Sequence, residues 1–187
     1  GAGRPALLQF GSDTDFTLSF GVRSQGGWSG DPVILSNKNW GSGSNPGWAI
    51  AAELGGSNWQ WNFTGDQSGR IDFDPSNAQI ADDNWHLVTI THDRSGNAVF
   101  YQDGVSIGTR SIASAGDVDT AFPIQIGRDG NGQYPFSSPA WIDDLKVWRR
   151  VLDSSEVSAL VGQDPVVHLK FAGNLLDDSG NGLPATA

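Results

Sequence analysis

The sequence predicts an all-β protein, an antiparallel β-sandwich of two sheets with one short helix near its C-terminal end. The first observation is the stretch 83–108, where apolar and polar residues alternate with a period of two and no helical period is present. The second is composition, because 25 glycines and 9 prolines fit many short strands joined by tight turns. The third is a hydrophobic fraction of 37%, rich in aromatic and β-branched residues, which excludes a disordered chain.

The stretch 83–108 is expected to fold as two successive hairpins. In its first strand, one face carries His86, Val88, Ile90 and His92. A turn follows at 93–97, and the second turn is Asp103-Gly104, a pair that suits the tight hairpin turns favoured by the right-handed twist of strands.

The segments on either side of these hairpins supply the other elements, about a dozen strands in all. The predicted strands are 5–10, 15–23, 33–36, 48–53, 58–63, 122–127 and 141–149. Residues 65–79 are expected to be irregular, and long polar loops are expected at 37–46 and 128–140. Asp153, followed three residues later by Glu156, predicts the N-cap of a short helix that ends near Leu160.

Three motifs resemble segments of one family, and they follow one another in the order that the family has. They are DFTLSF at 15–20, WHLVTIT-x-DR-x-GNA-x-x-Y-x-DG at 85–104 and WIDDLKVWRRVLDSSEV at 141–157. Together they resemble the laminin G-like, concanavalin A-like lectin and glucanase domains, including bacterial modules of this type. The resemblance covers most of residues 7–161 and implies a jelly-roll fold. It is less specific for function, because one fold carries many functions.

The segment 165–187 resembles the opening strand and loop of that family, although it stands at the end of this chain. Two interpretations are open. The segment folds back onto the sheet, so that 1–187 is a single jelly-roll domain, or it begins a following repeat. A free strand would expose Val166, Leu169 and Phe171 and leave an unpaired edge, which favours the fold-back.

The formal charge of −10 argues against binding to nucleic acid or to anionic membranes, which both need a positive surface. It is compatible with calcium, with neutral glycans, with cationic partners, or with solubility alone. The absence of cysteine excludes disulfides and thiolate metal sites. No signal peptide and no apolar run of membrane-spanning length is present. We expect a mature or excised piece of a larger secreted or cell-surface protein, without membrane insertion.

The two long loops form the first candidate site. Their neutral oxygens come from five amides: Asn37, Asn39, Asn45, Asn131 and Gln133. Asp129 adds a carboxylate, and calcium takes about six to eight such oxygen ligands. The resemblance to pentraxin and laminin-G domains implies a calcium and ligand site at loops near these positions, although Arg128 departs from their more acidic pattern. The alternatives are turn-forming residues alone, or direct ligand contact without a metal.

A second candidate metal site combines Asp143 and Asp144 in the last strand with Asp178 in the C-terminal segment. The resemblance implies a calcium ion between the first and last strands. Because neighbouring residues of a strand face opposite ways, only one of Asp143 and Asp144 is expected to point toward it. The alternative is an aspartate that caps a neighbouring turn.

Aromatic residues form a third candidate site, since eight tryptophans are many for one small domain. Trp28, Trp40 and Trp48 lie in or beside loops, where exposed rings next to asparagine and glycine suit a sugar platform, with Tyr134 and Phe136 from the facing loop. The alternative is that these rings pin the loops to the sheets. The tryptophans in strand patterns are expected to be interior: Trp59, Trp61, Trp85, Trp141 and Trp148.

Catalysis has little support. The E-x-D-x-x-E strand of glucanases with this fold is absent, and His86 and His92 are too far apart for one metal ion. An enzyme would need a cleft with two suitably spaced acids. We therefore expect a non-catalytic, calcium-binding module that recognises a glycan or a cell-surface partner. It would accompany other domains of its parent chain, such as a secreted hydrolase. The alternative is a structural or adhesive repeat without a small-molecule ligand.

Overall fold

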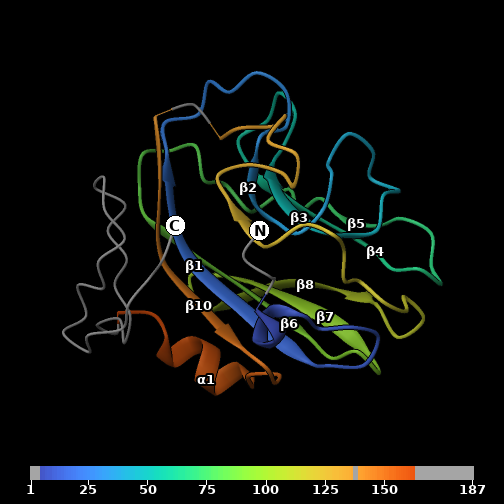
Figure 1. Ribbon diagram of the computed structural model, residues 1–187. Coiled ribbons are helices and arrows are strands. Elements are labelled where there is room, and N and C mark those ends of the chain that lie inside the picture. The colour runs from blue at the N-terminus through green and yellow to red at the C-terminus, as the bar shows by residue number, and fades with distance from the viewer. Residues whose placement is uncertain (1–4, 137–138, 163–187) are drawn as a thin grey trace.

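The computed structural model describes residues 5–136 and 139–162, and this part of the chain forms a β-sandwich. Ten strands build two antiparallel five-stranded sheets that face each other, as Figure 1 shows. The predicted jelly-roll sandwich with one short α-helix is therefore confirmed. The segment 165–187, and with it the choice between fold-back and following repeat, lies outside the described residues. Within them, no helix is long and apolar enough to cross a membrane.

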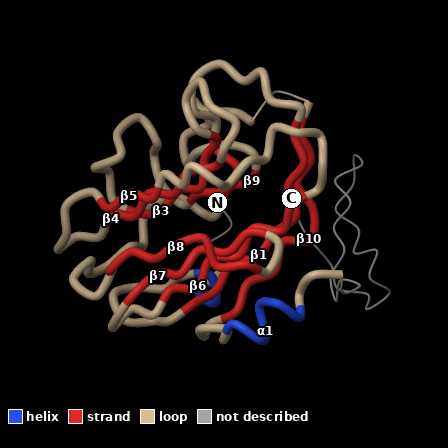
Figure 2. Tube along the Cα trace, turned by 180° about the vertical axis from the view of Figure 1, so that it is seen from behind, coloured by secondary structure: helices blue, strands red, loops and turns tan. Residues whose placement is uncertain are grey.

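The first sheet has the strand order β10-β1-β6-β7-β8. Its strands are β1 (Phe16–Ser24), β6 (His86–His92), β7 (Asn97–Gln102), β8 (Val105–Ser111) and β10 (Ala140–Trp148). The second sheet has the order β5-β4-β3-β2-β9. Its strands are β2 (Val33–Ser36), β3 (Gly47–Ala52), β4 (Trp59–Thr64), β5 (Ile71–Phe73) and β9 (Gln125–Ile126). Figure 2 shows the two layers from behind.

The strands β6, β7 and β8 confirm the two successive hairpins predicted for 83–108. Asp103 and Gly104 connect β7 to β8 with φ values of 52° and 77°, the left-handed conformation that a tight hairpin turn of this kind requires. On the other side, β6 pairs with β1, where Leu18 stands opposite Ile90. The inner faces of these strands supply half of the core.

The core between the sheets is aromatic. The phenyl rings of Phe73 and Phe100 stack at 4.0 Å, and the Trp61 ring meets Phe100 edge-on at 4.9 Å. Trp59 and Trp61 are both buried on the inner face of β4, which confirms that they share a face. Such ring pairs add about 0.5–1.5 kcal/mol each to the free energy gained from area burial.

Three predicted elements are wrong in type or extent. Residues 5–10 are not a strand, because Ala6–Leu8 forms the 3₁₀ helix η1, and its alanine and leucines lack the β-branching that favours strands. The irregular region 65–79 contains β5, a short edge strand beside β4. The strand expected at 122–127 is reduced to β9, and the described chain has ten strands instead of a dozen.

Two of the tryptophans expected in the interior are exposed. Trp85 is 49% exposed just before β6, and Trp141 is 43% exposed near the start of β10. Trp141 precedes the core-packed Ile142, so its side chain lies on the outer face, where the Arg23 guanidinium covers its ring at 5.0 Å. The predicted period of two was correct for this strand, but Trp141 was expected on its inner face and lies on its outer face.

The short helix α1 (Ser154–Ala159) begins at the predicted cap. The Asp153 carboxylate accepts the Ser155 and Glu156 N–H groups, and the Glu156 carboxylate accepts the Asp153 N–H. Val157 packs with Tyr101 and Leu152, and Trp148 is half-buried against this cluster. The helix thus covers part of the outer face of the first sheet.

Candidate functional site

Asp129 joins the two long loops that were predicted to form one site. Its buried carboxylate accepts the backbone N–H of Trp40 at 3.0 Å from the first loop. From its own loop it accepts the N–H groups of Gln133 at 2.7 Å and Tyr134 at 3.3 Å. In return, the Gly130 N–H donates to the Lys38 carbonyl at 2.6 Å. The loops therefore lie side by side and are held by one carboxylate.

Three asparagines complete this junction. With its amide nitrogen turned toward the carboxylate, Asn131 donates to Asp129 Oδ1 at 3.0 Å and accepts from Asn39 Nδ2 at 3.3 Å. The Asn45 amide donates to the Asn39 carbonyl at 3.0 Å. The structure thus brings together most of the residues predicted for this site: Asn39, Trp40, Asn45, Asp129, Asn131, Gln133 and Tyr134.

Asn37 and Trp48 do not join this group, so their prediction as exposed ligand-binding residues is wrong. The Asn37 amide donates to the Val118 carbonyl at 2.9 Å and accepts the Trp48 N–H at 2.7 Å. Both residues are buried, and the Trp48 ring packs in the core 6.5 Å from Phe16. Trp48 is the second residue of β3, whose alternation turns its ring inward.

The Trp40 ring pins its loop to the outer face of the second sheet. It is 6% exposed and packs with Val33, Ala49 and Ala51, while its indole N–H donates to Asp31 at 2.8 Å. The expected open platform of Trp40 and Trp48 is therefore absent, because the Trp40 ring pins its loop to the sheet and the Trp48 ring belongs to the core. Of the aromatic rings in these two loops, Tyr134 and Phe136 keep partial exposure.

The outer surface of the joined loops is neutral and polar. We call the exposed residues Ser42, Ser44, Asn131 and Gln133, together with the half-buried Tyr134, the loop rim. Hydroxyl and amide groups both donate and accept hydrogen bonds, which suits a ligand covered with hydroxyl groups. Because Asp129 fixes the backbone beneath these side chains, the rim is pre-organised.

A buried lysine behind the rim was missed by the sequence analysis. Lys38 is fully buried, and its ammonium donates to the Gly43 carbonyl at 3.0 Å and to Asn62 Oδ1 at 2.5 Å. Burial lowers its pKa to about 7, with help from Arg70 and against the attraction of Asp72. No local signal separates this lysine from an exposed loop lysine, since its neighbours are polar.

The calcium prediction concerns two places. At Asp129, three backbone N–H groups occupy the carboxylate, which gives it a loop-bridging role. At Asp143 and Asp144, the third predicted ligand, Asp178, lies outside the described residues. Among the residues that are described, no group of three or more histidine or acidic side chains could hold a metal ion. Calcium therefore stays a prediction at both places.

Asp143 and Asp144 line a hollow of about 330 Å³ on the outer face of the first sheet. Its walls come from Gly21, Trp85, His86, Leu87, Asp103, Asp143, Asp144, Leu160, Val161 and Gly162. Asp144 has a φ of 53°, at the point where the register between β1 and β10 shifts. This bulge interrupts the alternation of side chains at Asp144, so the rule that neighbouring residues of a strand face opposite ways does not assign a direction to the two aspartates here.

His86 joins two carboxylates at the edge of this hollow. Its Nδ1 lies 2.8 Å from Asp103, and its Nε2 lies 3.1 Å from Asp82. Burial alone would lower the pKa of His86, but the hydrogen bonds to these carboxylates outweigh it and raise the pKa.

The raised pKa of His86 predicts a pH-dependent stability. The contribution is fully present below the unfolded-state pKa of 6.5 and is lost as the pH rises through the higher folded-state pKa. Urea unfolding over this range should show that stability falls more steeply in the wild type than in His86→Gln. Equal slopes for the two proteins would contradict this assignment.

The two described histidines, His86 and His92, lie in different surroundings on β6. His92 is fully buried, and its ring stacks on Phe16 at 3.9 Å. Burial, helped by Arg94, lowers its pKa to about 3, so it is a neutral aromatic core residue at neutral pH. His86 lies on the same strand but near the outer hollow, and the third histidine, His168, lies outside the described residues.

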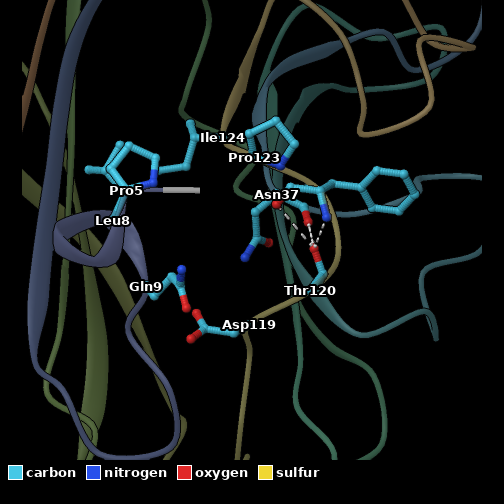
Figure 3. Close-up of a pocket in the computed structure, with 9 residues that line it drawn as sticks. Pro5, Leu8, Gln9, Asn37, Asp119, Thr120, Pro123 and Ile124 are labelled. Carbon is cyan, nitrogen blue, oxygen red and sulfur yellow. Dashed lines mark hydrogen bonds between the residues drawn. The ribbon is translucent and has the colours of Figure 1, made fainter. Parts of the chain in front are cut away.

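A second cavity, of about 210 Å³, lies between η1 and the segment before β9 (Figure 3). Its polar lining is used by the fold. The Asp119 carboxylate accepts the Phe10 N–H at 2.9 Å, and the Thr120 hydroxyl donates to the Asn37 carbonyl. The remaining lining is mainly apolar, with Leu8, Phe122 and Ile124 among its residues.

Two facing antiparallel sheets with long loops at one end define a jelly-roll β-sandwich. The chain belongs to the Concanavalin A-like lectin/glucanases superfamily, whose family model matches residues 4–158. No curated protein matches the chain significantly.

Solved structures share the fold at low sequence identity. The binding domain of Paraclostridial Mosquitocidal Protein 1 is 23% identical, covering 82% of this chain and 38% of its own, with a TM-score of 0.65. The botulinum neurotoxin serotype G binding domain is 22% identical, covering 91% and 42%, with a TM-score of 0.61. The receptor binding domain of botulinum neurotoxin mosaic serotype C/D is 20% identical, covering 84% and 38%, with a TM-score of 0.62. The present chain thus spans well under half of each of these chains.

Proposed function

We propose that this chain is a non-catalytic binding module of a larger extracellular protein and that its loop rim recognises a neutral glycan on a cell surface. The observation that carries the proposal is the junction at Asp129, which holds two loops of hydroxyl and amide side chains as one surface. The binding and receptor-binding domains named above have the same fold, which supports a binding role. In this proposal the larger protein is a secreted hydrolase, and the present chain is its accessory module.

The chemistry of the rim favours a neutral ligand. The protein as a whole is strongly acidic, with a formal charge of −10, but the five rim residues carry no charge. The half-buried Tyr134 ring packs against Trp40, Val33, Ala49 and Ala51, so it is fixed in place. A fixed ring with a partly open face can stack on a pyranose, while Gln133 and Asn131 bind its hydroxyl groups.

A glycan array probed with the full chain, with and without calcium, tests this proposal. Gln133→Ala and Tyr134→Ala are each expected to weaken binding about tenfold or more, because one lost contact of this kind is worth roughly 1.4 kcal/mol. Ser111→Ala, at the exposed end of β8, serves as the control and should bind normally. Loss of binding after chelation would support the predicted role of calcium.

Two results would contradict the glycan assignment. One is the absence of binding to every glycan, which would favour the structural or adhesive repeat. The other is binding that neither rim variant weakens, which would place the site elsewhere on the molecule.

A further inference from the structure

One side of the sandwich has two neighbouring sheet edges. β5 contacts β8 on one side of the molecule, so β9 and β10 are the last strands of their sheets on the other side. Figures 1 and 2 agree that β9 and β10 lie on this same side. Among the described strands, β10 pairs with β1 and β9 pairs with β2.

The apolar core is incompletely covered on this side. Ile142, Leu145 and Val147 of β10 pack against the core but are only partly buried. By contrast, Leu18, Phe20 and Val22 of the adjacent β1 are at most 1% exposed.

The opposite sheet shows the same difference. Ile124, beside β9, and Ile126 are partly buried, whereas Ile34 and Leu35 of β2 are completely buried. The cavity of about 210 Å³ adjoins Ile124. Apolar side chains that stay partly exposed along two neighbouring edges are costly in water and mark a surface that another segment covers.

We propose that residues 166–171 of this same chain add to the edge of β10 as a further strand and close the core. Their sequence is VVHLKF, in which Val167, Leu169 and Phe171 alternate with His168 and Lys170. In a strand, the three apolar residues share one face, which would cover Ile142, Leu145 and Val147. The inference is independent of any ligand at the loop rim.

The end of the described chain fits this occupant. Gly162 lines the outer hollow together with Asp143 and Asp144 of β10, so the chain leaves the described region beside this strand. The three residues 163–165 can span about 10 Å, which gives the next segment room to approach the strand beside which Gly162 lies. On the outer face, His168 and Lys170 would then lie near the two aspartates, whose charge they complement.

The test uses the full chain with Leu169→Asp and Phe171→Asp combined. A charged pair on the core face should detach the strand, lowering the Tm by about 10 °C or more and speeding amide exchange in β10 at least about tenfold. The control is Lys170→Arg, which changes the outer face of the same segment but keeps its positive charge, and it should leave the exchange of β10 nearly unchanged. Light scattering gives the mass of each protein.

The outcomes separate the possible occupants. A monomer whose β10 amides are protected in the wild type and exposed in the double variant supports the proposal. Unchanged Tm and exchange in the double variant would overturn it. A wild-type dimer that the double variant dissociates would also overturn it, because the segment would then cover the neighbouring copy.

Discussion

Replacing Asp129 with alanine is expected to lower the free energy of unfolding by about 3–5 kcal/mol. The carboxylate is buried and accepts three backbone N–H groups, those of Trp40, Gln133 and Tyr134. Each buried donor that loses its acceptor costs about 1–3 kcal/mol. Part of this free energy is recovered where a water molecule enters and accepts the hydrogen bond. Because the donors lie in two loops, the variant should also loosen the loop rim.

Urea unfolding measures this effect, and two variants serve as controls. Asp129→Asn keeps one acceptor oxygen and should lose roughly half as much free energy. Arg128→Ala removes the exposed side chain next to it and should change stability by less than about 0.5 kcal/mol. If Asp129→Ala were as stable as Arg128→Ala, the carboxylate would not hold the loops together.

The fold was predictable wherever local pattern and turn chemistry agree. Strict alternation placed β6 and β7, Asp103-Gly104 set the hairpin between β7 and β8, and the Asp153 cap set the start of α1. These signals are local, since each depends on residues within a few positions of one another. The prediction of a strand at 5–10 was wrong because it also depended on a local signal, and a short apolar run fits a helical turn as well as a strand.

Burial and partners were less predictable, because they depend on residues distant in sequence. Asn37 is buried, and its amide donates to the Val118 carbonyl, 81 positions away in the sequence. Asp129 was predicted as a calcium ligand, which stays a prediction, whereas its observed partners are backbone N–H groups, which every residue except proline offers. The bulge at Asp144 likewise arises from pairing with β1, and no turn-forming residue in the sequence indicates its position.

The second prediction with a large expected effect concerns Lys38, whose burial should make the free energy of unfolding increase as the pH rises above neutral. Its folded-state pKa is about 7, well below the ordinary 10.5, because the ammonium is buried. Between these values the unfolded chain binds a proton that the folded chain lacks, so stability rises with pH across this window. The wild type should therefore gain about 4 kcal/mol relative to Lys38→Met as the pH rises from about 7 to about 10.

Methionine is the informative replacement because it keeps an unbranched apolar stem and removes the titrating group. The Gly43 carbonyl retains the Thr64 hydroxyl as a donor at 2.8 Å, whereas Asn62 Oδ1 loses its ammonium partner. That loss lowers the stability of the variant by a similar amount at every pH, so the change with pH isolates the proton. Lys146→Met, on β10, controls for net charge. Parallel stability curves for the wild type and Lys38→Met would show that the buried ammonium keeps its proton throughout.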